Sequence, residues 1–169
     1  MRDAPISLVA PDSAWPAMFE AEQARLNEVL GEWLVGEPVH IGSTAVPGLW
    51  AKPVIDIMAP VASLAAERPA IAAAAELDYV HFPYRAELMH WFCKPSPAQR
   101  THHLHLVPID APLWRERLAF RDALRANATW RGEYEALKRE LAARHANDRE
   151  AYTDGKTAFV QRVLRTCGV

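Results

Sequence analysis

The chain has 169 residues, of which 50% are hydrophobic and 24% are charged, and its formal net charge is −2. This length fits a single globular domain, which we expect to span residues 1–169. The slightly acidic balance argues against a nucleic-acid partner, because a basic excess supplies most of the affinity for phosphate backbones. We expect neither a membrane span nor a signal peptide, since no stretch approaches the ~18 apolar residues that a bilayer requires. A cytoplasmic location follows as the expectation.

Helical periodicity and capping residues predict five helical segments. The first begins at a cap on Asp12 or Ser13 and runs to about Leu34. An alanine-rich helix has Pro69 in its first turn and ends near Leu77. The C-terminal third is helical throughout, near 111–126, 129–146 and 149–166, with expected caps at Asp110 and Asp148.

Five shorter segments have the composition of strands: 38–41, 53–59, 79–84, 87–93 and 101–107. The second is apolar on both faces apart from Asp56, which is typical of a strand covered on both sides. Predicted strands and helices are mixed up to residue 107, and only helices are predicted after it. The order predicts an α+β (mixed α/β) fold, in which helices pack on one mixed sheet.

The first strand ends in a Gly-Ser dipeptide, Gly42-Ser43. Gly42 permits a sharp turn, and Ser43 offers a hydroxyl and a backbone N–H. If a helix begins here, its free N–H groups make an anion site. The alternative is an ordinary turn, in which Ser43 only caps.

Two strands carry ionisable side chains among apolar neighbours. Strand alternation places Asp56 on the same face as Val54 and Met58, where a carboxylate needs an ion pair, hydrogen bonds or a metal. Either a structural partner such as Lys52 or a functional site would satisfy it. His103 and His105 share a face of the last strand, where they could bind a metal or line a polar pocket.

The C-terminal helices place basic residues on their inward faces. Arg117 and Arg121 fall within the apolar arc of the first of these helices, and Lys138 and Lys156 fall beside the apolar stripes of the next two. Each could extend its charge to the helix edge. A shared anion, either Asp56 or a ligand phosphate, accounts for the four together.

With these residues noted, the sequence resembles the GrpB family, whose domain is similar to the nucleotidyltransferase (polymerase-beta-like) fold. The resemblance rests on HIGSTAVPGL, KPVIDIM and RTHHLHLVP in that order, and extends from PDSAWP to DREAYTDGKTAFV. A similar domain is fused to dephospho-CoA kinase in some bacteria. The resemblance therefore implies a nucleotide or CoA-type ligand.

The resemblance also implies roles for individual residues. Gly42 and Ser43 match the signature that holds the triphosphate in nucleotidyltransferases, and Asp56 matches the first metal-binding carboxylate of that superfamily. Met58 stands where the superfamily has its second acid. His103 or His105 takes the strand position of the third. One carboxylate is too few for a pair of Mg²⁺ ions, so a single Mg²⁺, Mn²⁺ or Zn²⁺, or a cluster of basic side chains alone, fits these residues better.

Three functions follow as hypotheses. The first is an enzyme that transfers a nucleotidyl or phosphoryl group to a small acceptor, the second a nucleotide- or CoA-binding module without catalysis, and the third a histidine-based metallohydrolase. Asp56, His103 and His105 are the expected catalytic or metal-binding residues. The expected phosphate- or substrate-binding residues are His40, Gly42, Ser43, Thr44, Lys52, Arg117, Arg121, Lys138, Tyr152 and Lys156.

Overall fold

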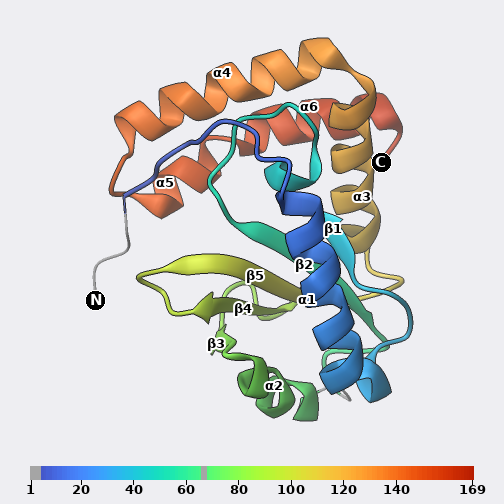
Figure 1. The fold of residues 1–169 in the computed structure, drawn as a ribbon. Coiled ribbons are helices and arrows are strands. Elements are labelled where there is room, and N and C mark those ends of the chain that lie inside the picture. The colour runs from blue at the N-terminus through green and yellow to red at the C-terminus, as the bar shows by residue number, and fades with distance from the viewer. Residues whose placement is uncertain (1–4, 66–67) are drawn as a thin grey trace.

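A five-stranded mixed sheet organises the chain (Figure 1). The structure is a computed structural model and describes residues 5–65 and 68–169. The strand order is β1-β2-β5-β4-β3, with β2 and β5 parallel and every other neighbouring pair antiparallel. The bounds are β1 Val39–Ile41, β2 Ile55–Val61, β3 Val80–Phe82, β4 His90–Pro95 and β5 Arg100–Pro108. The α+β class with a mixed sheet, predicted from the sequence, is confirmed.

Helices cover both sides of the sheet. α1 and α2 lie on one side, α3 stands beside the other, and α4 and α6 run across the end of the molecule opposite α2 (Figure 1). The bounds are α1 Trp15–Leu30, α2 Pro69–Ala74, α3 Pro112–Ala126, α4 Ala128–Arg144, α5 Arg149–Asp154 and α6 Thr157–Cys167. Among the described residues, no helix has the length and hydrophobicity that crossing a membrane requires.

Strand alternation divides the interior into separate clusters. Ile55 and Ile57 of β2 pack with the helices α1 and α2, together with Leu104 of β5. Met58 instead packs with Ile41 and residues of α3. Because Asp56 shares the face of Met58, its carboxylate lies on the α3 side, as the alternation predicted.

Several predicted helix boundaries are wrong. α1 ends at Leu30 and continues only as a 3₁₀ turn, Gly31–Trp33. The predicted cap of α3 is also wrong. Ala111, not Asp110, is its N-cap residue, and no side chain caps this helix. Pro112 opens that helix, where its missing N–H is not needed. Asp148 does cap α5, accepting a hydrogen bond from Ala151 N at 3.0 Å.

The helix predicted over 149–166 is two helices separated at Gly155. A Cβ atom at Gly155 would lie 2.5 Å from Leu141 Cδ2, so α5 and α4 approach more closely than a side chain here would allow. The strand predicted over 87–93 is shifted along the chain, because β4 begins at His90, after a turn in which Arg85 has φ 49°, and continues to Pro95.

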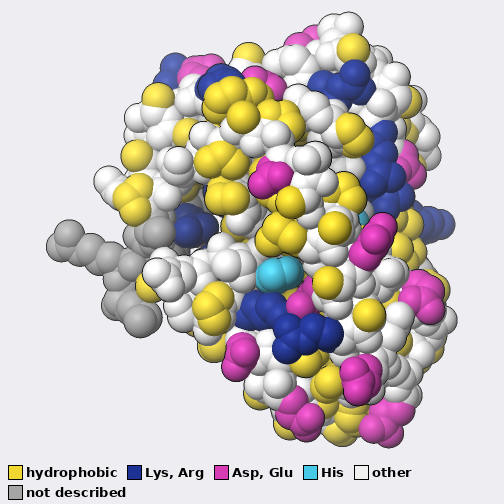
Figure 2. Space-filling view, in the orientation of Figure 1, with side chains coloured by type: hydrophobic (Ala, Val, Ile, Leu, Met, Phe, Trp, Pro, Cys, Tyr) yellow, Lys and Arg dark blue, Asp and Glu magenta, His cyan; other side chains and the backbone are white. Residues whose placement is uncertain are grey.

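The visible surface mixes charges of both signs. On the face in Figure 2, Lys and Arg side chains are interspersed with Asp and Glu side chains and do not form one continuous basic stripe. Hydrophobic side chains gather mainly on the upper half of this face. This distribution does not resemble a nucleic-acid-binding surface, which concentrates Lys and Arg along a groove.

Candidate functional site

Gly42 brings the end of β1 directly over the carboxylate of Asp56. Its φ of 72° and ψ of −174° belong to a region that essentially only glycine occupies. A Cβ atom at this position would lie 2.5 Å from Asp56 Oδ2. The turn that follows, Ser43–Ala45, is a three-residue 3₁₀ turn. The condition for the helix N-terminal anion site is therefore not met, and the ordinary turn that was its alternative fits this segment.

Asp56 and two histidines form the polar centre of the α3 side. The parallel register of β2 and β5 pairs Asp56 with His103 and Met58 with His105. His103 Nδ1 lies 2.8 Å from Asp56 Oδ1, and His105 Nε2 lies 3.7 Å from the same oxygen. Both histidines are buried, whereas 28% of the Asp56 side chain is exposed. The carboxylate is thus the part of this centre that is most exposed to solvent.

Burial and mutual contact set the charges of this centre. Burial would raise the pKa of Asp56, but the hydrogen bond with His103 and the nearby ring of His105 hold it well below its usual value. Burial lowers the pKa of His105 to about 4, against the opposing attraction of Asp56, 3.7 Å away, and with the help of the Arg117 charge. At neutral pH the centre therefore holds a carboxylate and, at His105, a neutral imidazole.

Two buried nitrogen atoms of this centre have no hydrogen-bond partner in the described part of the chain: His103 Nε2 and His105 Nε2. His103 Nδ1 contacts Asp56 Oδ1, whereas its Nε2 contacts no polar atom of the described residues. His105 Nδ1 lies 3.3 Å from Met89 Sδ, a weak acceptor. Buried polar atoms without partners are uncommon in native proteins and indicate a place for a ligand, an ion or water.

The same three residues have the chemistry of a metal site. One ligand atom from each of Asp56, His103 and His105 lies within 4.8 Å of the others. Two imidazoles and one carboxylate suit Mn²⁺ or Zn²⁺ better than Mg²⁺, which prefers oxygen ligands. The donor set thus fits one ion and does not fit a pair.

Basic side chains from several elements surround this centre. Lys138 of α4 is 2% exposed, and its Nζ donates to Ser43 Oγ at 3.0 Å and to the Trp50 carbonyl. Lys156, between α5 and α6, and Lys52 both lie over the ring of Tyr152, with Nζ 4.5 Å and 5.1 Å from its centre. Tyr152 itself is buried, so it separates and positions the two ammonium groups.

Among these cations, Lys156 interacts more strongly with another cation than with an acid, whereas the strongest charge partner of Lys138 is Glu135. Burial lowers the pKa of Lys156 to about 7, and the charges of Lys52, Lys138 and Arg117 add to that effect while Asp56 opposes it. Burial also lowers the pKa of Lys138 to about 7. Arg117, likewise lowered in pKa by burial, interacts most strongly with Asp56. Arg117 and Lys156 thus share one carboxylate, Asp56, which is also in contact with the histidines.

Sequence comparisons agree with the motifs. The profile of the family described as GrpB protein matches residues 5–166. The chain is 35% identical over 164 residues to the glutamate-rich protein GrpB of Alkalihalophilus pseudofirmus, covering 94% of each. The chain belongs to the GrpB family. The family resemblance stated from the sequence is confirmed.

Two further relatives extend this assignment. The crystal structure of the conserved protein GrpB from Enterococcus faecalis matches the GrpB-family chain with a TM-score of 0.84 at 30% identity, over 95% of this chain and 96% of that one. A dephospho-CoA kinase of Mycolicibacterium paratuberculosis is also 30% identical, over 96% of this chain and 46% of that protein. The fold is thus shared along nearly the whole chain.

Three of the predicted site residues lie away from the Asp56 centre of this GrpB-family chain. His40 is on the opposite face of β1, where its ring stacks on Phe19 at 4.9 Å and its Nε2 contacts Thr44 Oγ1 at 2.9 Å. Thr44 donates to Val54 O, and Arg121 donates to His40 O. Together they line a separate groove of about 650 Å³ beside α1. They stabilise the turn, and burial lowers the pKa of His40 to about 4.

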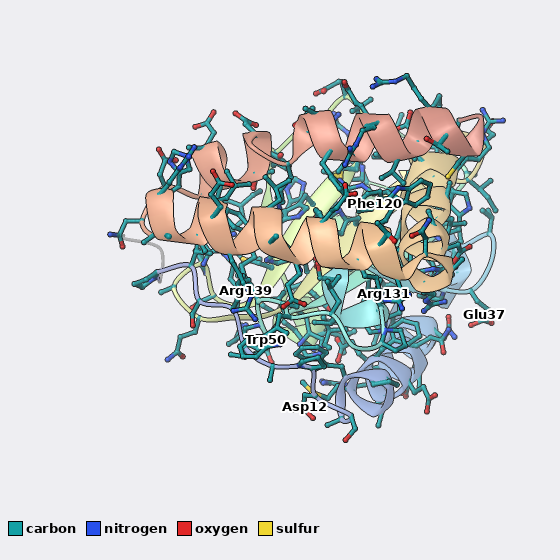
Figure 3. The ribbon with its side chains drawn as sticks, turned by 90° about the horizontal axis from the view of Figure 1, so that it is seen from above. Asp12, Glu37, Trp50, Phe120, Arg131 and Arg139 are labelled. Carbon is teal, nitrogen blue, oxygen red and sulfur yellow. The ribbon has the colours of Figure 1, made fainter. Side chains whose placement is uncertain are left out.

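The sequence did not indicate that Tyr134 would contact Ser43, or that the Trp50 carbonyl would accept a hydrogen bond from Lys138. Tyr134 is buried, stacks on Phe159 at 5.1 Å, and its hydroxyl interacts with Ser43. Tyr134 belongs to an apolar helical stripe, which predicts burial of its ring. A buried tyrosine hydroxyl also needs a hydrogen-bond partner, which the stripe does not identify. Arg139 lies over the Trp50 ring at 4.1 Å, and Figure 3 shows the two side chains together beneath α4.

Proposed function

We propose that this GrpB-family protein binds a phosphorylated small molecule, of nucleotide or CoA type, and transfers its nucleotidyl or phosphoryl group to a small acceptor. The observation that supports this most is that Arg117 and Lys156 share one carboxylate, Asp56, which is already in contact with two histidines. A ligand phosphate would balance the two basic side chains. The resemblance to nucleotidyltransferases and the related dephospho-CoA kinase support the same ligand class.

Each polar group has a role in such a transfer. Arg117 and Lys156 would neutralise the charge that develops on the phosphoryl oxygens, a stabilisation that basic groups alone can supply. His103 would take the proton of the acceptor hydroxyl on Nε2, with its ring held by the Nδ1 hydrogen bond to Asp56. Burial of His105 keeps that imidazole neutral beside the carboxylate.

A divalent metal is compatible with this proposal. Asp56, His103 and His105 would hold it, and it would supply Lewis-acid stabilisation of phosphoryl charge. A metallohydrolase that uses the same three residues is the corresponding alternative. It requires stoichiometric Zn²⁺ or Mn²⁺ in the purified protein, which elemental analysis measures directly.

The main alternative is a binding module without catalysis. Met58, which is fully buried on the α3 side of the sheet, occupies the position of the second superfamily acid. A nucleotidyltransferase-like domain with one acid could keep its phosphate pocket and lose its chemistry. This alternative predicts ligand binding that is insensitive to EDTA and that survives Asp56→Asn.

Thermal unfolding in the presence of ligands tests the proposal. ATP, GTP, CoA and pyrophosphate, each with and without divalent metal, should raise the melting temperature of the wild type. At 100 times the dissociation constant, a ligand stabilises the folded state by about 2.7 kcal/mol. Arg117→Met should abolish most of this shift. Release of phosphate or pyrophosphate from bound nucleotide should disappear in Asp56→Ala.

Arg115→Met is the matched control, because Arg115 is an exposed arginine two residues earlier on α3. It should leave the ligand-induced shift unchanged. An equal loss in both variants, or no shift with any phosphorylated ligand, would contradict the proposed site. Binding without turnover across a broad panel of acceptors would favour the binding module.

A further inference from the structure

Ser43 and Lys138 form a hydrogen-bonded pair next to the turn that follows β1. Lys138 Nζ lies 3.0 Å from Ser43 Oγ and also contacts the Trp50 carbonyl, so two bonds hold the amine in place. Ser43 is partly exposed, whereas Lys138 is almost completely buried. The serine can thus be reached by a ligand while its partner is shielded from water.

The backbone presents this serine in a special way. Ser43 follows Gly42, whose conformation is restricted to glycine, at a sharp turn between a strand and a 3₁₀ turn. Strained turns of this kind are found where a side chain must be presented to a ligand. An exposed nucleophilic serine on a sharp turn after a strand is a recurring solution in hydrolases of other folds.

Lys138 has the properties of a base at neutral pH. Burial lowers its pKa to about 7, and the charges of Lys52 and Arg139 add to this effect while Glu135 opposes it. The charges of Lys156 and Lys138 also repel each other. A neutral amine can donate one N–H to the Trp50 carbonyl and accept the proton of Ser43 with its lone pair. Tyr134 places a further hydroxyl near Ser43.

We propose that Ser43 is a nucleophile with Lys138 as its general base, and that phosphoryl transfer passes through a phosphoserine at Ser43. This inference rests on the proposed function for its substrate class, a phosphoanhydride. In the first step the Ser43 Oγ–P bond forms, the P–O bond to the leaving phosphate chain breaks, and the Oγ proton moves to Lys138. The leaving group departs as an anion beside Arg117 and Lys156.

The second step returns the enzyme to its starting state. An acceptor hydroxyl attacks the phosphoserine, so its O–P bond forms while the Ser43 Oγ–P bond breaks. Its proton goes to His103 Nε2, which is buried and has no partner in the described part of the structure. Ser43 Oγ recovers its proton from Lys138, and His103 releases the other to solvent. Serine–lysine pairs perform the same division of labour in known acyl-transfer enzymes.

Covalent labelling with a neutral alkyl fluorophosphonate tests the pair without depending on phosphate binding. Attack by Ser43 forms an Oγ–P bond and releases fluoride, and intact-mass and peptide analysis report the site. We expect Ser43 to be labelled, with a rate that rises through pH 7 and levels off about one pH unit higher as Lys138 deprotonates. Lys138→Arg keeps the charge but removes the base, and should slow labelling by about 100-fold or more.

Ser13→Ala, at an exposed serine, is the matched control and should leave the labelling rate unchanged, whereas Ser43→Ala should abolish it. Melting curves establish that each variant is folded, and the pH profile of the wild type tests the base if Lys138→Arg does not fold. Three results would each overturn the proposal. They are labelling of Ser43 no faster than that of Ser13, a labelling rate without pH dependence, and a wild-type labelling rate in Lys138→Arg. If labelling fails while ATP still raises the melting temperature, only the covalent step is wrong. If labelling occurs but no phosphorylated ligand binds, the phosphoryl substrate is wrong.

Discussion

The two faces of the sheet contain buried charges that are arranged in opposite ways. On the α1–α2 face, Lys94 of β4 forms an ion pair with Glu22 of α1, and both are buried. Tyr79 donates to the same carboxylate at 3.0 Å, and its ring lies under the Lys94 ammonium. Arg25 approaches Glu22 from the surface at 3.6 Å. Each buried charge on this face has an opposite charge in direct contact.

On the α3 face the basic groups outnumber the acids. Lys156 and Lys52 share the ring of Tyr152, and Lys138 is held by a hydroxyl and a carbonyl. Asp56 is in contact with the histidines instead. A fold that needs an ionic contact for stability pairs it, as Glu22 and Lys94 are paired. Cations that are buried without this compensation lower stability, and in the proposed function a ligand phosphate would supply the negative charge.

Truncating one lysine on each face should give the largest contrast. Lys94→Met removes the buried partner of Glu22 and leaves only the exposed Arg25 as its opposite charge, so we expect a loss of about 3 kcal/mol in the free energy of unfolding. Lys156→Met removes a cation from a positive environment, so we expect a change between zero and a gain of about 2 kcal/mol. Urea unfolding at pH 7 measures both. A loss of similar size in the two variants would mean that Lys156 is also a structural ion-pair partner.

The turn over Asp56 provides the second test. Gly42→Ala forces an alanine into a glycine-only conformation, which costs about 1–3 kcal/mol, and adds a methyl group that would contact the carboxylate. Gly132→Ala is the control, since this helical glycine has open space around its Cα and should become more stable by up to about 1 kcal/mol. Urea unfolding compares them, and a stable Gly42→Ala protein would show that the turn can move away from Asp56.

The contrast between the faces was largely predictable from the sequence, because alternation along a strand is a local property. Alternation groups Asp56 with Met58 and His103 with His105, and the register of β2 and β5 brings the acid and both histidines together. The same rule also assigns His40 to the face opposite Ile41, yet its position in the HIGST motif suggested a site residue. Strand alternation therefore places His40 on the α1 side, away from Asp56, although the two residues belong to neighbouring motifs.

Tertiary contacts determined what the sequence could not predict. Nothing local indicates that Leu141 lies against Gly155, the contact that divides α5 from α6. The periodicity of α4 placed Lys138 at the edge of an apolar stripe, but the bond to Ser43 joins residues 95 positions apart. The pairing of Glu22 with Lys94 spans 72 positions in the same way. Such contacts depend on how helices dock, which periodicity does not encode.

The third test of the contrast between the two faces is the pH dependence of stability, for which we expect the smallest effect. Lys138 and Lys156 have pKa values of about 7 in the folded state and 10.5 as the ordinary value. Between these values the unfolded chain binds more protons than the folded chain, so stability should rise with pH. We expect a rise of about 1–2 kcal/mol per lysine from pH 7 to 9, within the limit of ~1.4 kcal/mol per pH unit for one proton. Chemical unfolding across this range should give a smaller slope for Lys156→Met than for the wild type. Equal slopes would mean that Lys156 keeps its proton when folded, as a lysine with a matched acid would.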